Sequence, residues 1–97
     1  MAAAAAKKGC TTAGHDGYPS VSIPDCSSNV NINGVGAVTV GHNSVSHSKP
    51  DNPPHAVTVS SGSATVFVNG KPLAKMGSAC GCGDKIAGGC SGNVNVG

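Results

Sequence analysis

A short pattern that occurs three times in this chain constrains its fold more than any other feature. Residues 28–34 read SNVNING, residues 64–70 read ATVFVNG and residues 92–97 read GNVNVG. Each copy alternates apolar and polar residues, as in a β-strand with one buried face, and Asn-Gly at the end of the first two copies indicates a hairpin turn. The sequence therefore predicts three copies of one strand, with valine and isoleucine on the buried face.

The match continues beyond the first two turns, where residues 34–42 and 70–78 align without a gap. Each of these copies is therefore expected to be a hairpin. The third copy stops at Gly97, but residues 4–10 (AAAKKGC) fit the missing return strand. We expect a single domain over residues 1–97, in which the N- and C-terminal segments complete one shared repeat and the three units close into a ring. The alternative is an unstructured alanine-rich tail.

Few residues are available to build a core. The chain has one Phe, one Tyr, one Leu and no Trp, and a domain of 97 residues with so little apolar volume usually needs a disulfide, a metal or a partner. Charged residues make up 10% of the chain and the formal charge is +2, far from the basic surface that nucleic-acid binding requires. We therefore expect no nucleic-acid partner.

The first eight residues, MAAAAAKK, do not form a conventional export signal, because the lysines follow the short apolar run instead of preceding it. No stretch approaches the roughly 18 apolar residues of a membrane-spanning helix. The sequence therefore predicts a soluble protein that is made in the cytoplasm without a signal peptide.

The five cysteines are an odd set, so they cannot all form disulfides within the chain. Cys26 and Cys90 align with Gly62 in the repeats, which favours small structural residues, although a disulfide between the two remains an alternative. Four histidines accompany the cysteines. Metal ligation therefore explains at least some of the thiols better than disulfide bonding does.

Residues 72–75 carry the resemblance to a known family. Pro72-Leu73-Ala74-Lys75, within GSATVFVNGKPLAKMGS, resembles the Pro-Ala-Ala-Arg signature of the PAAR-repeat proteins, with Lys for Arg. Residues 36–39 and 4–7 occupy the same place in degenerate form. The resemblance implies an all-β fold, a small pointed pseudo-threefold cone of three β-hairpins stapled by one metal ion.

The resemblance also implies a function. Such a cone caps a trimeric β-helical spike protein, one monomer per trimer, in type VI secretion systems, contractile phage tails and related injection machines. The expected task is to pierce the target cell envelope, with transient contact to the target membrane. The protein would be located at the tip of a phage tail spike in the virion, or be secreted through a contractile apparatus.

The long connections after Gly9, Gly41 and Gly77 contain the candidate metal ligands. His15 lies six residues after Gly9, His47 six after Gly41 and Cys82 five after Gly77. The middle connection is the longest and can return a second imidazole. We therefore predict four ligands: His15, His47, His55 and Cys82. The resemblance to the PAAR-repeat family implies three histidines and one cysteine, which agrees with this set.

Three imidazoles and a thiolate suit one structural Zn²⁺, with iron as the alternative metal. His42 is the reserve for His55, and Cys80 is the reserve for Cys82. Four protein ligands would leave no open position for a substrate, and the chain has no Glu, nucleophile elbow or phosphate-binding loop, so we expect no enzyme.

Three other functions remain open from the sequence. They are a metal-dependent hydrolase with an open fourth position, a small metal-binding or redox protein that uses Cys80 and Cys82, and a disulfide-stapled adhesin-like domain. A hydrolase would show a metal-bound water, and a redox protein would show reversible thiol chemistry. An adhesin-like domain would lose stability with a reductant but not with a chelator.

Overall fold

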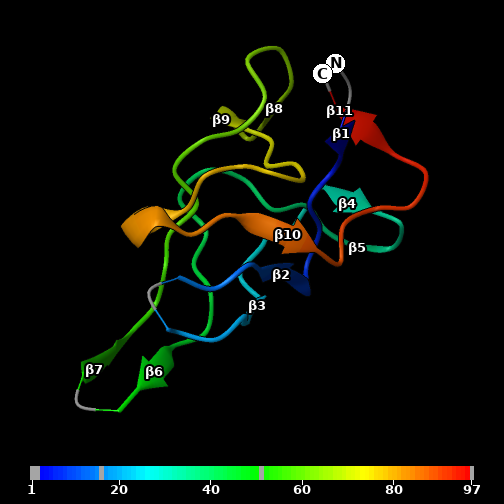
Figure 1. Cartoon of the computed structure of the whole chain (residues 1–97). Helices are drawn as coiled ribbons and strands as arrows, with labels where there is room; N and C mark the ends of the chain where they lie inside the picture. The colour runs from blue at the N-terminus through cyan, green and yellow to red at the C-terminus, as the bar shows by residue number, and fades with distance from the viewer. Residues whose placement is uncertain (1–2, 16, 51, 97) are drawn as a thin grey trace.

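The computed structural model describes residues 3–15, 17–50 and 52–96, and within these ranges all side chains except those of Lys49, Asn52 and Cys82. The described chain is all-β apart from one short 3₁₀ turn (Figure 1). Its elements are β1 (Ala3–Ala4), β2 (Cys10–Thr12), β3 (Ser22–Ile23), β4 (Asn31–Ile32), β5 (Val35–Gly36), β6 (His47–Lys49), β7 (Asn52–His55), β8 (Phe67–Val68), β9 (Lys71–Pro72), η1 (Gly81–Gly83), β10 (Ile86–Gly88) and β11 (Asn95–Val96). Within the described ranges, no helix is long and apolar enough to span a membrane.

Two Asn-Gly turns form hairpins, as the repeat predicts. β4 pairs with β5 and β8 pairs with β9, both antiparallel. Asn33 and Asn69 have φ of 52° and 53°, and the following glycines also have positive φ. Positive φ at both central residues is the type I′ geometry, whose twist matches that of the flanking strands.

A third pair joins the two ends of the sequence. β11 pairs antiparallel with β1, so that Val96 lies opposite Ala3. This register is equivalent to that of Ile32 opposite Val35 in the first hairpin. Figure 1 shows both labelled termini beside this pair. We interpret it as the third member of the repeat.

The return arms of the three pairs meet in a closed ring of backbone hydrogen bonds. The N–H of Ala6 donates to the carbonyl of Ala74, Ala74 donates to Val38, and Val38 donates to Ala6, over 2.9, 2.9 and 3.2 Å. All three residues are fully buried. Since each arm donates to one neighbour and accepts from the other, the arrangement is pseudo-threefold.

A buried serine precedes each of the three pairs. The hydroxyl oxygens of Ser27, Ser63 and Ser91 each accept hydrogen bonds from the backbone N–H groups two and three residues further on. This short turn satisfies backbone donors that no strand partner reaches. The paired strands that follow these turns are only two residues long.

Fewer of the alternating valines are buried than the repeat predicts. Ile32, Val68 and Val96 are buried, together with Leu73 and Ala37, in a cluster at the hairpin end. Val66 and Val94, which precede the strands, are instead 39% and 37% exposed. The equivalent Val30 is half-buried and packs against the cluster, so the three copies differ at this position.

A second core cluster includes the three ring residues and extends to β3, β10 and the segment of residues 57–59. Its largest members are Ile23, Ile86, Val57 and Val59, all at most 1% exposed. Cys10 and Cys80 are buried in it. Cys26 and Cys90 are both free thiols, so the alternative of a disulfide between them is wrong.

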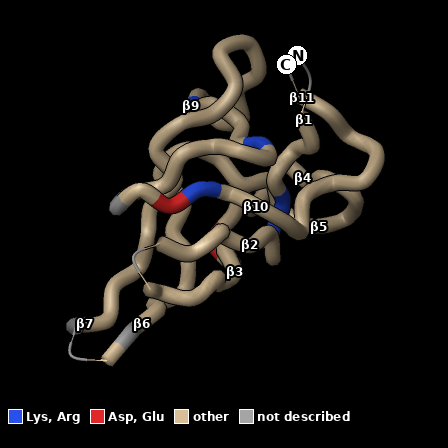
Figure 2. Tube along the Cα trace, in the orientation of Figure 1, with Lys and Arg blue, Asp and Glu red and all other residues tan. Residues whose placement is uncertain are grey.

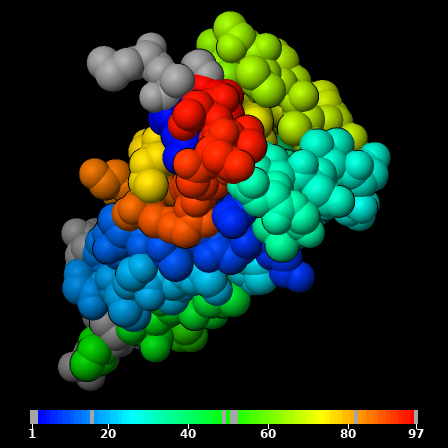
Figure 3. Space-filling view, turned by 90° about the vertical axis from the view of Figure 1, so that its right-hand side faces the viewer, coloured from blue at the N-terminus to red at the C-terminus, as the bar shows by residue number. Residues whose placement is uncertain are grey.

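The molecule tapers. The three strand pairs occupy the broad end, and the ribbon of β6 and β7 projects from the other end (Figures 1 and 3). The principal-axis extents are 39 × 27 × 23 Å. These features confirm the predicted small all-β cone.

Candidate metal centre

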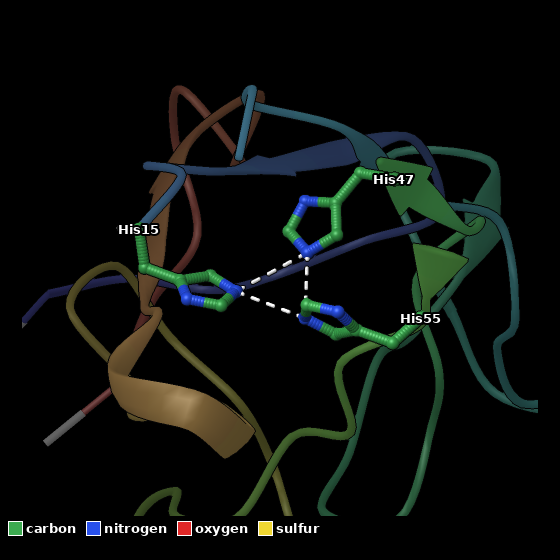
Figure 4. Close-up of side chains that lie close together, drawn as sticks. All are labelled: His15, His47 and His55. Carbon is green, nitrogen blue, oxygen red and sulfur yellow. Dashed lines mark hydrogen bonds between the residues drawn. The ribbon is translucent and has the colours of Figure 1, made fainter. Parts of the chain in front are cut away.

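Three imidazoles converge near the narrow end of the cone. The Nε2 atoms of His15, His47 and His55 form an almost equilateral triangle, with separations of 3.2, 3.1 and 3.0 Å (Figure 4). His47 is buried, and the other two are half-buried. This triad is a group of residues that could hold a metal ion.

The ribbon of β6 and β7 brings two of these histidines together. His47 and His55 are direct partners across the antiparallel pair, so their side chains lie on the same face. The pairing continues outside the two strands, at Ser44 and Val57. The Ser44 N–H donates to the Val57 carbonyl over 2.9 Å, and the Val57 N–H donates to the Ser44 hydroxyl over 3.0 Å. The long middle connection is thus an antiparallel arm, not an irregular loop.

A tight turn positions the third histidine. The Tyr18 N–H donates to the His15 carbonyl over 2.6 Å, and the His15 N–H donates back to the Tyr18 carbonyl over 3.2 Å. Gly14 precedes this turn with a φ of +86°, and a Cβ there would lie 2.6 Å from the Tyr18 carbonyl oxygen. Only glycine therefore allows the chain to enter the turn at this angle.

Hydrogen bonding alone cannot satisfy the Nε2 triangle. An imidazole nitrogen carries either a hydrogen or a lone pair, so at least one edge of a three-membered ring must join two donors or two acceptors. A cation that accepts all three lone pairs removes this conflict. A tetrahedral Zn²⁺ with Zn–N bonds of about 2.0 to 2.1 Å needs nitrogens about 3.3 to 3.4 Å apart, close to the separations observed. The triad therefore fits a metal.

The backbone selects the metal-binding tautomer of His47. Its Nδ1 lies 2.9 Å from the carbonyl oxygen of Pro19, which can only accept, so Nδ1 carries the hydrogen and Nε2 keeps its lone pair. Outer hydrogen bonds of this kind orient metal-binding imidazoles in many proteins.

The predicted cysteine ligand lies in η1, and its side chain is outside the described part of the structure. The backbone on either side of it is tied to the histidine-bearing loops. The Gly81 N–H donates to the Thr58 carbonyl over 2.9 Å, close in sequence to His55. Asp84 accepts from the N–H of Gly14, next to His15, over 2.9 Å. The turn that carries Cys82 is thus attached to both loops.

Neither reserve ligand joins the triad among the side chains that the structure describes. His42 closes a turn, since its Nδ1 accepts a hydrogen bond from the Thr39 N–H over 2.9 Å. Cys80 is buried in the core, where desolvation and then the nearby Asp84 raise the pKa of its thiol to about 11. A thiol held neutral in this way is poorly suited to redox chemistry.

The PAAR motif pattern matches residues 4–88 of the chain. The chain belongs to the PAAR motif family. The match covers all three histidines of the triad and the Pro72–Lys75 segment that resembles the signature. Proteins of this family are associated with the spike tips of type VI secretion and other contractile systems. No curated protein matches the chain at a significant level.

Two residues of this region were missed by the sequence-based reasoning. Tyr18 packs against the imidazoles, and Asp84 links the end of η1 to the loop of His15. Neither has an equivalent in the repeats. A signal did exist for both, because Tyr18 is the only tyrosine and Asp84 is one of only four acidic residues.

Proposed function

We propose that this chain is the metal-stabilised tip of a contractile injection machine and that one monomer caps a trimeric β-helical spike. The observation that carries the proposal is the closed ring of Ala6, Val38 and Ala74, because it gives one chain three nearly equivalent strand pairs. A monomer with pseudo-threefold symmetry can present similar surfaces to three identical chains.

The broad end of the cone is the proposed spike-binding surface. Phe67 is 57% exposed there, next to the exposed Val66, and Val94 at the same end is also exposed, while Ile32, Val68 and Val96 form a buried cluster. Exposed apolar groups of this kind favour a protein partner. Lys and Asp are scattered singly or in adjacent pairs along the described trace and form no continuous stripe (Figure 2).

The narrow end would meet the target envelope first. We propose that His15, His47, His55 and Cys82 hold one structural ion there, Zn²⁺ in preference to iron. Four protein ligands close the coordination sphere, so that the energy of metal binding becomes energy of folding and the site performs no catalysis. The protein would act mechanically, in a phage virion or through a secretion apparatus, and contact the target membrane only briefly.

Metal content tests the site. Purified protein should contain about one metal ion per chain, and His47→Ala and Cys82→Ser should each lose metal and melt at a lower temperature. His42→Ala is the matched control, because His42 caps a turn away from the triad. Full metal retention in both ligand variants would refute the assignment.

Mixing with a trimeric spike tests the partner. One monomer should bind per trimer, and Phe67→Asp should weaken binding about tenfold because it places a charge at the centre of an apolar contact. Val45→Asp is the control, since Val45 is 42% exposed but belongs to the ligand-bearing arm. A metal-loaded monomer that does not bind any blunt spike end would overturn the capping function and leave the metal site intact.

A further inference from the structure

Tyr18 covers one face of the imidazole triad. Its ring centroid lies 5.0 Å from that of His15, 4.8 Å from that of His47 and 4.3 Å from that of His55. The imidazole centroids are themselves 4.5 to 5.1 Å apart. The four rings thus stand at the corners of a nearly regular tetrahedron, with the phenol ring above the triangle of imidazoles.

The geometry of each contact is favourable. Tyr18 is stacked on His15 and His47 with interplanar angles of 24° and 29°, and it meets His55 edge to face at 73°. Stacked and edge-to-face pairs are the preferred arrangements of aromatic rings. One side chain therefore restricts the orientation of all three imidazoles.

Tyr18 is held in place by hydrogen bonds at its backbone and at its hydroxyl group. Its backbone closes the turn with His15, and its hydroxyl donates to the Pro53 carbonyl over 3.3 Å, two residues before His55. The next residue, Pro19, provides the carbonyl that orients His47. Tyr18 thereby links the N-terminal ligand loop to the β6–β7 arm independently of any metal.

We infer that Tyr18 is a positioning and shielding residue of the metal centre, which orients the three imidazoles and slows exchange of the ion by excluding water from one face of the site. This inference rests on the proposed metal site and assigns a role to a residue that binds no metal itself. It also implies that the fourth ligand approaches from the face opposite the phenol ring.

The intrinsic fluorescence of the protein offers a direct test, because Tyr18 is the only tyrosine and there is no tryptophan. Binding of one Co²⁺ per chain should quench this emission strongly, since the fluorophore stacks on the ligands. Emission that is unchanged by bound Co²⁺ would overturn the inference, even if no variant of Tyr18 could be produced in folded form.

Release of Co²⁺ to excess EDTA tests the shielding. Tyr18→Leu should release the ion about tenfold faster than the wild type, as expected for loss of a group that supports metal ligands. Tyr18→Phe, which keeps the ring, should stay within about twofold of the wild type. Phe67→Leu is the control for removing an aromatic ring, because Phe67 lies at the broad end of the cone.

The outcomes separate the two proposals. If the wild type binds no Co²⁺ or Zn²⁺, the metal centre fails and the role of Tyr18 fails with it. If the wild type binds one ion and Tyr18→Leu releases it at the wild-type rate, only the role of Tyr18 fails.

Discussion

Asp84 and Gly14 join the end of η1 to the loop of His15, two segments that are far apart in the sequence: the Asp84 Oδ1 accepts the N–H of Gly14 over 2.9 Å, across 70 residues. The carboxylate is 2% exposed and also accepts the N–H of Lys85 over 2.8 Å. It therefore satisfies two backbone donors in a place that water hardly reaches.

Asp84→Ala should lower the free energy of unfolding by about 1 to 3 kcal/mol, because it leaves buried donors without an acceptor. Asp84→Asn keeps an acceptor oxygen and should cost less. Urea unfolding of the metal-free protein measures both. Asp25→Ala is the matched control, since Asp25 accepts the N–H of Asn43 at an exposed site. Equal losses at positions 84 and 25 would contradict the interpretation.

Gly14→Ala should weaken metal binding, an effect that backbone strain at a positive φ does not explain by itself. The new Cβ would lie 2.6 Å from the Tyr18 carbonyl oxygen, so the turn that carries His15 must shift. Gly34→Ala has a similar positive φ but no atom within 4 Å of its Cβ, so it isolates the cost of backbone strain. Titration with Co²⁺ should show weaker binding for the first variant alone, and equal affinities would refute the steric argument.

Alkaline pH should destabilise the protein through Cys10. Burial, and then the nearby Cys90 and Cys80, raises the pKa of this thiol from 9.0 to about 12. Between these two pH values, the unfolded chain loses the thiol proton and the folded chain keeps it. The contribution of this thiol to the free energy of unfolding is therefore fully present below pH 9 and is lost as the pH rises toward 12. Unfolding of the metal-free protein should show this slope, and Cys10→Ala should make it shallower, while the raised thiol pKa of Cys80 keeps part of it. An unchanged slope would exclude Cys10 as a source.

Ser63→Ala should cost about 1 to 3 kcal/mol of unfolding free energy, because the buried hydroxyl accepts the N–H groups of both Thr65 and Val66. Ser60→Ala removes a hydroxyl that donates to the Ala79 carbonyl at an exposed site and should have a smaller effect. Thermal unfolding compares the two. A larger loss for Ser60→Ala would show that the serine turns do not stabilise the repeat.

Much of the fold could be predicted because it is encoded locally. The Asn-Gly turns at residues 33–34 and 69–70 require positive φ, which few other residue pairs tolerate, and the alternation on either side sets the register. The exposure of Val66 and Val94 could not be predicted, since the equivalent Val30 has the same local pattern but is half-buried against the core.

The repeat and the candidate ligand residues could be recognised from the sequence, because turn chemistry and spacing are properties of short segments. The way in which the candidate ligands come together depends on the tertiary fold. His47 faces His55 because the middle connection pairs with itself, and His15 reaches them because Gly14 is held by Asp84. Tyr18 covers the triad through contacts between separate loops. Such contacts depend on the path of the backbone in three dimensions, which no local pattern specifies.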